Sequence, residues 1–317
     1  MAKILSTSVS FGRHVASPVE KARELGHELR FLRYDPVTGK KDLLEAVGDA
    51  DALIVGTEPV DHHVFERAKN LKVVAKHGIG VDNIDLHEAE RHNVQVVNAP
   101  GTNATAVAEY TWALILDLMK KTPQAISEAR TGGWGKQIGL ELSGKRLGII
   151  GLGQIGKKVA VTGRGFGMTV AAFDPWFDVA FGEAHGVASE GLDCLLGNSD
   201  VLTIHTALND STYRLFNRAR LAMMKPSSFL INVARGGIVD EAALYEALTE
   251  GVIAGTACDV FEKEPPAPDN PLLGLANFLP TAHTAGYTFE SLERMGLMTV
   301  ESIHAVLNGE AVPNRVV

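Results

Sequence analysis

The chain has 317 residues, of which 45% are hydrophobic and 21% charged, and its formal net charge is −8. This composition predicts a globular protein of about two domains, and the negative charge argues against a general nucleic-acid surface. No apolar run reaches the ~18 residues that a membrane helix needs, and the N-terminus is typical of a first strand, not a signal peptide. Two cysteines make neither a disulfide framework nor a metal motif, so we expect no metal and a reducing, cytoplasmic location.

Short apolar runs alternate with helical patterns through the first hundred residues. The expected strands are residues 3–7, 27–32, 52–56, 72–76 and 94–98, and the expected helices are residues 17–25, 41–48, 61–70 and 85–92. This alternation predicts a parallel sheet with helices on both faces.

A helix over residues 104–119 is expected next, with Asn103 or Thr102 as its N-cap. This segment is apolar nearly all round, which is typical of a helix buried between two domains or two subunits.

A second alternation begins at residue 146 and extends almost to the end of the chain. The expected strands are residues 146–151, 169–174, 200–205, 228–233, 253–259 and 277–283, and the expected helices are residues 154–166, 214–224, 240–251 and 290–309. The sequence therefore predicts two doubly wound α/β domains in series. The terminal helix could also return to the N-terminal half, with the second domain inserted into the first.

The segment "GLGQIG" carries Gly151, Gly153 and Gly156 in the spacing of a dinucleotide-binding turn. The first glycine permits the tight turn, the second lets the backbone approach the pyrophosphate, and the third lets the helix pack on the strand. The N–H groups of Gln154 and Ile155 are expected to face phosphate. Glycines alone would also fit an ordinary strand-to-helix turn, but an apolar strand precedes them and a helical pattern follows.

An acidic residue at the end of the next strand indicates the choice of cofactor. Asp174 lies roughly 20 residues beyond the turn, where a ribose-binding carboxylate is expected. A carboxylate accepts hydrogen bonds from both ribose hydroxyls and repels a 2′-phosphate. The neighbouring "FDPWFD" contains no Arg or Lys to neutralise such a phosphate. We therefore expect NAD in preference to NADP.

Polar residues follow the later strands, at the edge of a parallel sheet where ligands bind. They are Thr206, Arg235, Asp259 with Glu264, and His283. Taken singly, Arg235 could be a surface ion-pair partner, Glu264 a solvated acid and His283 an ordinary loop histidine. Together, beside a nucleotide site, they indicate hydride transfer to a 2-keto acid. An Arg can bind the carboxylate, a His can protonate the keto oxygen, and a carboxylate can fix the His.

Several motifs together give the chain a specific resemblance. "GLGQIG", "FDPW", "NVARGGIVDEAAL", "ACDVFEKEPP" and "TAHTAGYT" resemble the D-2-hydroxyacid dehydrogenase family, and "VVAKHGIGVDNIDL" and "VVNAPGTNATAVAEYT" resemble D-3-phosphoglycerate dehydrogenases without regulatory domains. The resemblance implies Arg235, Glu264 and His283 as the catalytic set. It implies a cofactor site lined by Gly151, Gly153, Gln154, Ile155, Gly156, Asp174, Thr206, Val233, Ala234 and Asp259.

The resemblance also implies an architecture and a substrate site. A Rossmann NAD-binding domain (102–284) is expected to be inserted into a flavodoxin-like substrate-binding domain (1–101 and 285–317). The N–H groups of Ile79 and Gly80 would hold the substrate carboxylate together with Arg235, unless "KHGIG" is only a glycine-rich turn. Lys76 would reach a substrate phosphate or be solvated, and Asn103 would contact substrate, cap the helix, or do both.

The function implied is an NAD-dependent dehydrogenase of a small anionic D-2-hydroxy acid. 3-Phosphoglycerate, oxidised to 3-phosphohydroxypyruvate, is the favoured substrate, and glycerate/hydroxypyruvate, glyoxylate and D-lactate are the rivals. A weakly basic "GGWGKQIGLEL" counts against a phosphorylated substrate. A formate dehydrogenase and a nucleotide-sensing binding protein are distant alternatives. A homodimer is expected, with Trp134 near the subunit contact, and no feedback inhibition by serine.

Overall fold

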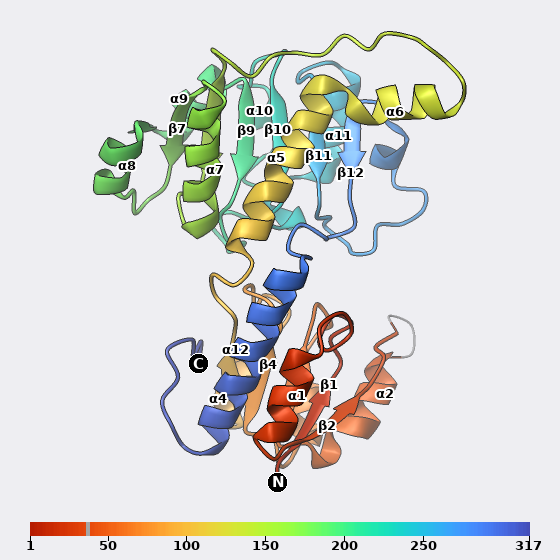
Figure 1. Ribbon diagram of the computed structural model, residues 1–317, viewed down its shortest axis with the longest axis vertical. Helices are drawn as coiled ribbons and strands as arrows, with labels where there is room; N and C mark the ends of the chain where they lie inside the picture. The colour runs from red at the N-terminus through yellow and green to blue at the C-terminus, as the bar shows by residue number, and fades with distance from the viewer. Residues whose placement is uncertain (36–38) are drawn as a thin grey trace. The chain divides into compact units, whose positions relative to one another are not determined.

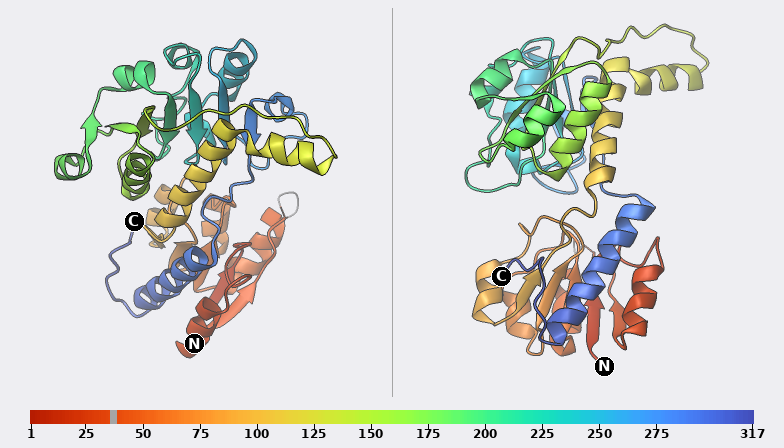
Figure 2. Two further views of the ribbon diagram at one scale, coloured as in Figure 1. Left: turned by 45° about the horizontal axis from the view of Figure 1, so that its top comes forward. Right: turned by 60° about the vertical axis from the view of Figure 1, so that its left-hand side comes forward.

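The computed structural model describes residues 1–35 and 39–317, which form two compact units (Figures 1 and 2). Unit 1 comprises Met1–Asn103 and Tyr287–Val317, and unit 2 comprises Ala104–Gly286. The chain thus begins in unit 1, builds unit 2 and returns to unit 1. Among the described residues, no helix is long and apolar enough to cross a membrane.

Unit 1 is a five-stranded parallel sheet with helices on its faces (Figure 1). Its strands are β1 (Lys3–Ser6), β2 (Glu28–Phe31), β3 (Ala52–Val55), β4 (Val73–Lys76) and β5 (Gln95–Val97), and its helices are α1 (Ser17–Glu24), α2 (Gly39–Ala46), α3 (His62–Arg67), α4 (Leu86–Arg91) and α12 (Phe289–Leu307). The order β2-β1-β3-β4-β5 is that of flavodoxin-like sheets. All four residues of β3 are buried, which explains its continuous apolar run.

The terminal helix α12 belongs to unit 1, where it packs against α1 and β4. Beyond α12, Arg315 forms an antiparallel bridge with Val97, so the last residues extend the sheet at β5. The C-terminal segment therefore closes the N-terminal unit.

Unit 2 is a seven-stranded parallel sheet. Its strands are β6 (Arg146–Ile150), β7 (Thr169–Phe173), β8 (Val187–Ser189), β9 (Val201–Ile204), β10 (Phe229–Asn232), β11 (Gly255–Cys258) and β12 (Phe278–Pro280), in the order β12-β11-β10-β9-β6-β7-β8. This is the Rossmann order with an additional strand, and it reverses between β6 and β9. The predicted fold class, two doubly wound parallel sheets, is confirmed.

The helices of unit 2 include three that the sequence analysis missed. The helices of this unit are α5 (Ala104–Lys120), α6 (Thr122–Arg130), α7 (Gln154–Gly165), α8 (Val179–His185), α9 (Leu192–Asn198), α10 (Arg218–Leu221) and α11 (Glu241–Thr249). The missed helices are α6, α8 and α9, and strand β8 was missed with them. Helix α6 buries no residue, and α8 and α9 are too short to show a clear apolar period.

The helix predicted over residues 214–224 is shorter than expected. Phe216 forms a bridge with Val239, and Arg214 has a left-handed φ of +48°, so the chain is not helical there. Asn217 then caps α10 by accepting a hydrogen bond from the Arg220 N–H. The apolar period over these residues comes from loop residues that also face the core.

Helix α5 packs against α7, β10 and β11 within unit 2. Within the single chain, Thr105, Glu109 and Ala113 form an exposed stripe on one face of α5, so its burial between two domains or two subunits stays a prediction. The predicted cap is wrong, because the Thr102 hydroxyl donates to the Ala99 carbonyl and the Asn103 Oδ1 accepts no hydrogen bond.

Candidate functional site

The turn between β6 and α7 is built around three glycines. Gly151 has a φ of +92°, and a Cβ there would lie 2.7 Å from the His205 carbonyl oxygen. A Cβ on Gly156 would lie 2.1 Å from the Gly151 oxygen. A Cβ on Gly153, in contrast, would meet nothing within 4 Å. The turn thus packs tightly against the end of β9, and only at Gly153 does it leave open space for a pyrophosphate.

The start of α7 and the end of β7 complete this part of the site. Gly153 is the N-cap of α7 and supplies no side-chain cap, so Gln154 and Ile155 begin the helix with N–H groups suited to an anion. Asp174 accepts hydrogen bonds from the Leu152 N–H (2.7 Å) and the Trp176 N–H (2.8 Å). Its carboxylate therefore lies against the turn, where a ribose would follow the pyrophosphate. Thr206, just beyond β9, lies beside Gly151.

Glu264 and His283 form a direct pair in unit 2. The His283 Nδ1 and the Glu264 Oε2 are 2.6 Å apart, and the two side chains are 35% and 30% exposed. Because Glu264 engages Nδ1, the Nε2 nitrogen of His283 is the one left for a reaction. Burial raises the pKa of Glu264, but hydrogen bonds from His283 and the Phe261 N–H, together with the charge of Arg235, lower that pKa below its ordinary value.

His283 has a left-handed backbone, with φ +50°, which is rare for a residue other than glycine. The residues around it are held by Asp259. The Asp259 Oδ1 accepts hydrogen bonds from the Thr281 hydroxyl (2.6 Å) and the Thr284 N–H (2.9 Å), and Oδ2 accepts one from the Ala285 N–H (2.8 Å). The Asp259 carbonyl accepts the His283 N–H at 2.7 Å. Asp259 therefore fixes the backbone that presents the imidazole.

This use of Asp259 differs from the contact with the cofactor that the resemblance implies. The residue is 1% exposed, and both of its carboxylate oxygens accept hydrogen bonds from the 281–285 loop. A buried carboxylate whose two oxygens already accept hydrogen bonds from a loop stabilises the conformation of that loop. The cofactor contact stays a prediction.

Arg235 follows β10 and is held by Asn232, a residue that the sequence analysis did not single out. The Asn232 side chain donates to the Arg235 carbonyl (2.9 Å) and accepts from the Ala234 N–H (3.1 Å). The Arg235 guanidinium donates to the Ala234 carbonyl at 2.8 Å. Val233, between Asn232 and Ala234, is buried. Only the polar end of an otherwise apolar strand, "FLIN", could have indicated Asn232.

The next residue, Gly236, brings the Arg235 loop against the loop that carries Glu264. A Cβ on Gly236 would lie 1.9 Å from the Phe261 carbonyl carbon and 2.4 Å from the Glu262 nitrogen. No side chain fits there, so the two loops are in backbone contact. The structure thus brings Arg235, Glu264 and His283 to neighbouring loops of one unit.

Lys76 of unit 1 is placed differently from the phosphate contact suggested by the sequence. It is 6% exposed, and its ammonium donates to the Gly56 carbonyl and to the Asn83 Oδ1 (2.7 Å). Asn83 also donates to the Glu58 carbonyl (2.6 Å), so the lysine ties together the turns after β3 and β4. The environment of Lys76 is that of an internal structural cation.

The "KHGIG" segment after β4 is held by its carbonyl groups. The Gly78 carbonyl accepts the Ala99 N–H (2.8 Å), and the Ile79 carbonyl accepts the Asn98 side chain (2.8 Å). With these carbonyls engaged, the N–H groups of Ile79 and Gly80 are the groups that this turn can offer to an anion. The Asn103 Oδ1 is buried and has no hydrogen-bond partner, so its contact with substrate stays a prediction.

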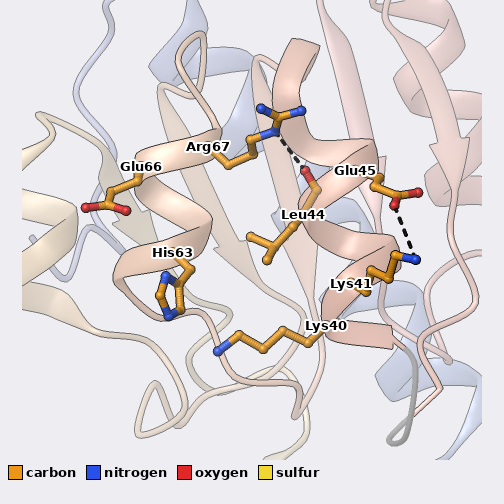
Figure 3. Close-up of a pocket in the computed structure, with 7 residues that line it drawn as sticks. All are labelled: Lys40, Lys41, Leu44, Glu45, His63, Glu66 and Arg67. Atoms are coloured by element: carbon orange, nitrogen blue, oxygen red, sulfur yellow. Dashed lines mark hydrogen bonds and ion pairs between the residues drawn. The ribbon is translucent and has the colours of Figure 1, made fainter.

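A separate groove lies in unit 1 between α2 and α3 (Figure 3). It is lined by Lys40, Lys41, Leu44, Glu45, His63, Glu66 and Arg67. Its basic groups are engaged locally: Lys40 pairs with Asp61, Lys41 with Glu45, and Arg67 donates to the Leu44 carbonyl. This groove contains none of the predicted site residues. Within residues 1–35 and 39–317, no group of three or more His, Cys, Asp or Glu is arranged to hold a metal.

Comparisons with known proteins agree with this geometry. The family model described as "D-isomer specific 2-hydroxyacid dehydrogenase, NAD binding domain" matches residues 112–285. The D-3-phosphoglycerate dehydrogenase of Archaeoglobus fulgidus is 41% identical over 280 residues, which are 87% of this chain and 53% of the relative. The glyoxylate reductase of Korarchaeum cryptofilum is 38% identical over 296 residues, which are 91% of this chain and 89% of the relative.

A solved structure with a similar fold contains the cofactor. The D-lactate dehydrogenase of Aquifex aeolicus, complexed with NAD and lactic acid, superposes with a TM-score of 0.86 at 28% identity, covering 97% of this chain and 96% of that one. The chain spans about half the length of the curated D-3-phosphoglycerate dehydrogenases it matches, 53% for the first two. Unit 2 contains the NAD-binding domain that the family model describes, and the chain belongs to the D-isomer specific 2-hydroxyacid dehydrogenase family.

Proposed function

We propose that this chain is an NAD-dependent oxidoreductase that transfers hydride between nicotinamide and a small D-2-hydroxy or 2-keto acid. The observation that carries the proposal is the Glu264–His283 pair, 2.6 Å apart, on the unit that bears the dinucleotide turn. Relatives named as dehydrogenases and reductases of 2-hydroxy acids support it.

The residues divide the chemistry as follows. When bound, NAD⁺ would accept the hydride from a hydroxy acid and NADH would supply it to a keto acid. His283 uses Nε2 to give a proton to the keto oxygen or to take one from the hydroxyl. The Glu264 carboxylate holds Nδ1 and so fixes the orientation of the ring and leaves Nε2 for the substrate. Arg235 binds the substrate carboxylate and polarises the carbonyl. General acid–base help of this kind contributes roughly 10²–10⁴-fold.

For the substrate, 3-phosphoglycerate is the first candidate and hydroxypyruvate or glyoxylate the second. Relatives with both names match at similar identities, 41% and 38%. The buried Lys76 is less suited to bind a substrate phosphate than the sequence suggested, because its ammonium donates to Gly56 and Asn83. D-Lactate is a third candidate, supported by the solved D-lactate dehydrogenase.

We further propose a homodimer formed by the segment after α5. Helix α6 buries no residue within the chain, and Trp134 and Ile138 beyond it are 83% and 82% exposed. Such exposed apolar side chains are typical of an interface. An Ile138→Asp variant should be monomeric by light scattering, and Val161→Asp, on the exposed face of α7, should not. A monomeric wild type at micromolar concentration would contradict this.

The free cysteines Cys194 and Cys258 fit a reducing, cytoplasmic location.

The experiment that tests the function is NADH oxidation with a panel of keto acids. The panel contains 3-phosphohydroxypyruvate, hydroxypyruvate, glyoxylate, pyruvate and 2-oxoglutarate, each repeated with NADPH. Turnover of at least one acid, with NADH preferred, is expected. Absence of turnover with every acid, while NADH still binds, would favour a nucleotide-sensing protein instead.

A further inference from the structure

The loop that carries Glu264 is fixed at two successive backbone groups. The Phe261 N–H donates to the Glu264 Oε1 (3.1 Å), and the Glu262 N–H donates to the Glu241 Oε1 (2.6 Å). Glu241 is the first residue of α11, the helix that follows the Arg235 loop. The turn at 261–262 is therefore shared between the predicted catalytic acid and a second acid on another element.

Glu241 makes two further contacts with the same loop. Its Oε2 accepts a hydrogen bond from the Asn270 side-chain N–H at 2.9 Å, and its own backbone N–H donates to the Glu262 Oε1 at 3.3 Å. Both carboxylate oxygens are thus used, one on each side of the segment that contains Glu264. The contacts on Glu241 bracket residues 262–270.

Capping of α11 does not explain this arrangement. An acid at a helix N-terminus commonly stabilises the helix through its dipole or by capping N–H groups. Here Asp240 is the cap, and its Oδ1 accepts the N–H groups of Ala242 and Ala243 at 3.1 Å each. The Glu241 oxygens bind the Glu264 loop, not the first turn of the helix.

We propose that Glu241 is a positioning residue for the reaction. By holding the 262–270 loop against the start of α11, it sets Glu264 in place relative to both His283 and the Arg235 loop. The inference rests on the proposed function, since Glu264 and His283 are its acid–base pair. The backbone contact between Gly236 and Phe261 lies in the same region and depends on the same spacing of the two loops.

Removal of Glu241 should loosen the turn that donates the Phe261 N–H to Glu264. Small displacements of groups that orient a reaction can cost up to about 10²-fold in rate. We therefore expect Glu241→Ala to lower kcat roughly 10- to 100-fold. The KM for NADH should stay within about twofold, because the dinucleotide turn lies on other strands. The acid limb of the kcat–pH profile should also move to higher pH, because Glu264 loses a hydrogen bond that stabilises its carboxylate.

The control and the rescue use the same helix. Glu246→Ala removes a carboxylate of α11 that pairs with the exposed Arg218, and kcat and the pH profile should not change. Glu241→Gln keeps one oxygen to accept the Glu262 N–H and should restore part of kcat. Helix destabilisation alone would not reproduce this pattern, because folded molecules would keep the wild-type pH profile.

A second variant keeps the proposal testable if Glu241→Ala folds poorly. Asn270→Asp retains the oxygen that accepts the Leu272 N–H (3.0 Å) but places a negative charge beside the Glu241 Oε2. It should lower kcat and move the acid limb in the same direction. If the wild type turns over a keto acid and both variants keep its kcat and pH profile, the role of Glu241 is refuted. If the wild type turns over none, the proposed function itself fails.

Discussion

The variant Asp259→Asn distinguishes between two roles for this residue, which are to hold the 281–285 loop and to contact the cofactor. The wild-type carboxylate is buried and accepts two backbone N–H groups, of Thr284 and Ala285, on different oxygens. An asparagine has one oxygen, so one of these N–H groups must face an NH₂ group and lose its acceptor. A buried donor left without a partner costs about 1–3 kcal/mol. The free energy of unfolding should fall by about this amount.

The loss of this hydrogen bond in Asp259→Asn should also lower the catalytic rate, because the bond helps to hold the backbone around His283. Its positive φ persists because the neighbouring backbone is held, and a looser loop would let the imidazole leave its place beside Glu264. We expect kcat to fall at least about tenfold, with the dissociation constant for NADH nearly unchanged. Denaturant unfolding, NADH fluorescence titration and steady-state kinetics on one preparation measure all three. Asp269→Asn, at an exposed site of the neighbouring loop, is the control. A large loss of NADH affinity with unchanged stability would instead show that Asp259 contacts the cofactor and does not hold the loop.

Gly236→Ala should destabilise unit 2 by about 1–3 kcal/mol and lower kcat, since its Cβ would collide with the Phe261 backbone, whereas Gly237→Ala, whose Cβ would meet the side chains of Leu208 and Tyr213 at 3.3 Å and beyond, should be mild. Wild-type kcat and stability in Gly236→Ala would contradict the backbone contact. Asp174→Ala should lower the ratio of kcat/KM with NADH to kcat/KM with NADPH, because the carboxylate that repels a 2′-phosphate is gone. An unchanged ratio would show that another residue selects NADH over NADPH. The lowered pKa of Glu264 stabilises the fold above pH 4.5, the ordinary value, and this contribution is lost as pH falls through the lowered pKa. The stability difference between wild type and Glu264→Gln should therefore narrow as pH falls below 4.5, and a difference that widens there would show the opposite shift.

The architecture was predictable because its signals are local. Strands such as β3 are buried on both faces and give continuous apolar runs, and the glycines of the dinucleotide turn have a fixed spacing. The return of α12 to unit 1 was only one of two readings, because its contacts with α1 and β4 join segments far apart in the chain.

The side-chain contacts were less predictable. Lys76 at the end of a strand fits a phosphate ligand as well as an internal cation, and only the positions of Gly56 and Asn83 decide between them. Asp259 and Glu241 are likewise acids at element ends, and nothing local shows that their oxygens hold loops 21 to 29 residues further along the chain. Helix α6 could not be found from apolar periodicity because it has no buried face in this chain.

In the proposed mechanism, Glu264 holds His283, and His283 is the acid–base group for hydride transfer. The most direct measurement compares wild type and His283→Ala for keto-acid reduction and NADH binding in the same preparations. We predict that the variant binds NADH like wild type but loses at least about 10²-fold in kcat with the keto acid that wild type reduces. A variant that turns over at the wild-type rate would remove His283 from the mechanism.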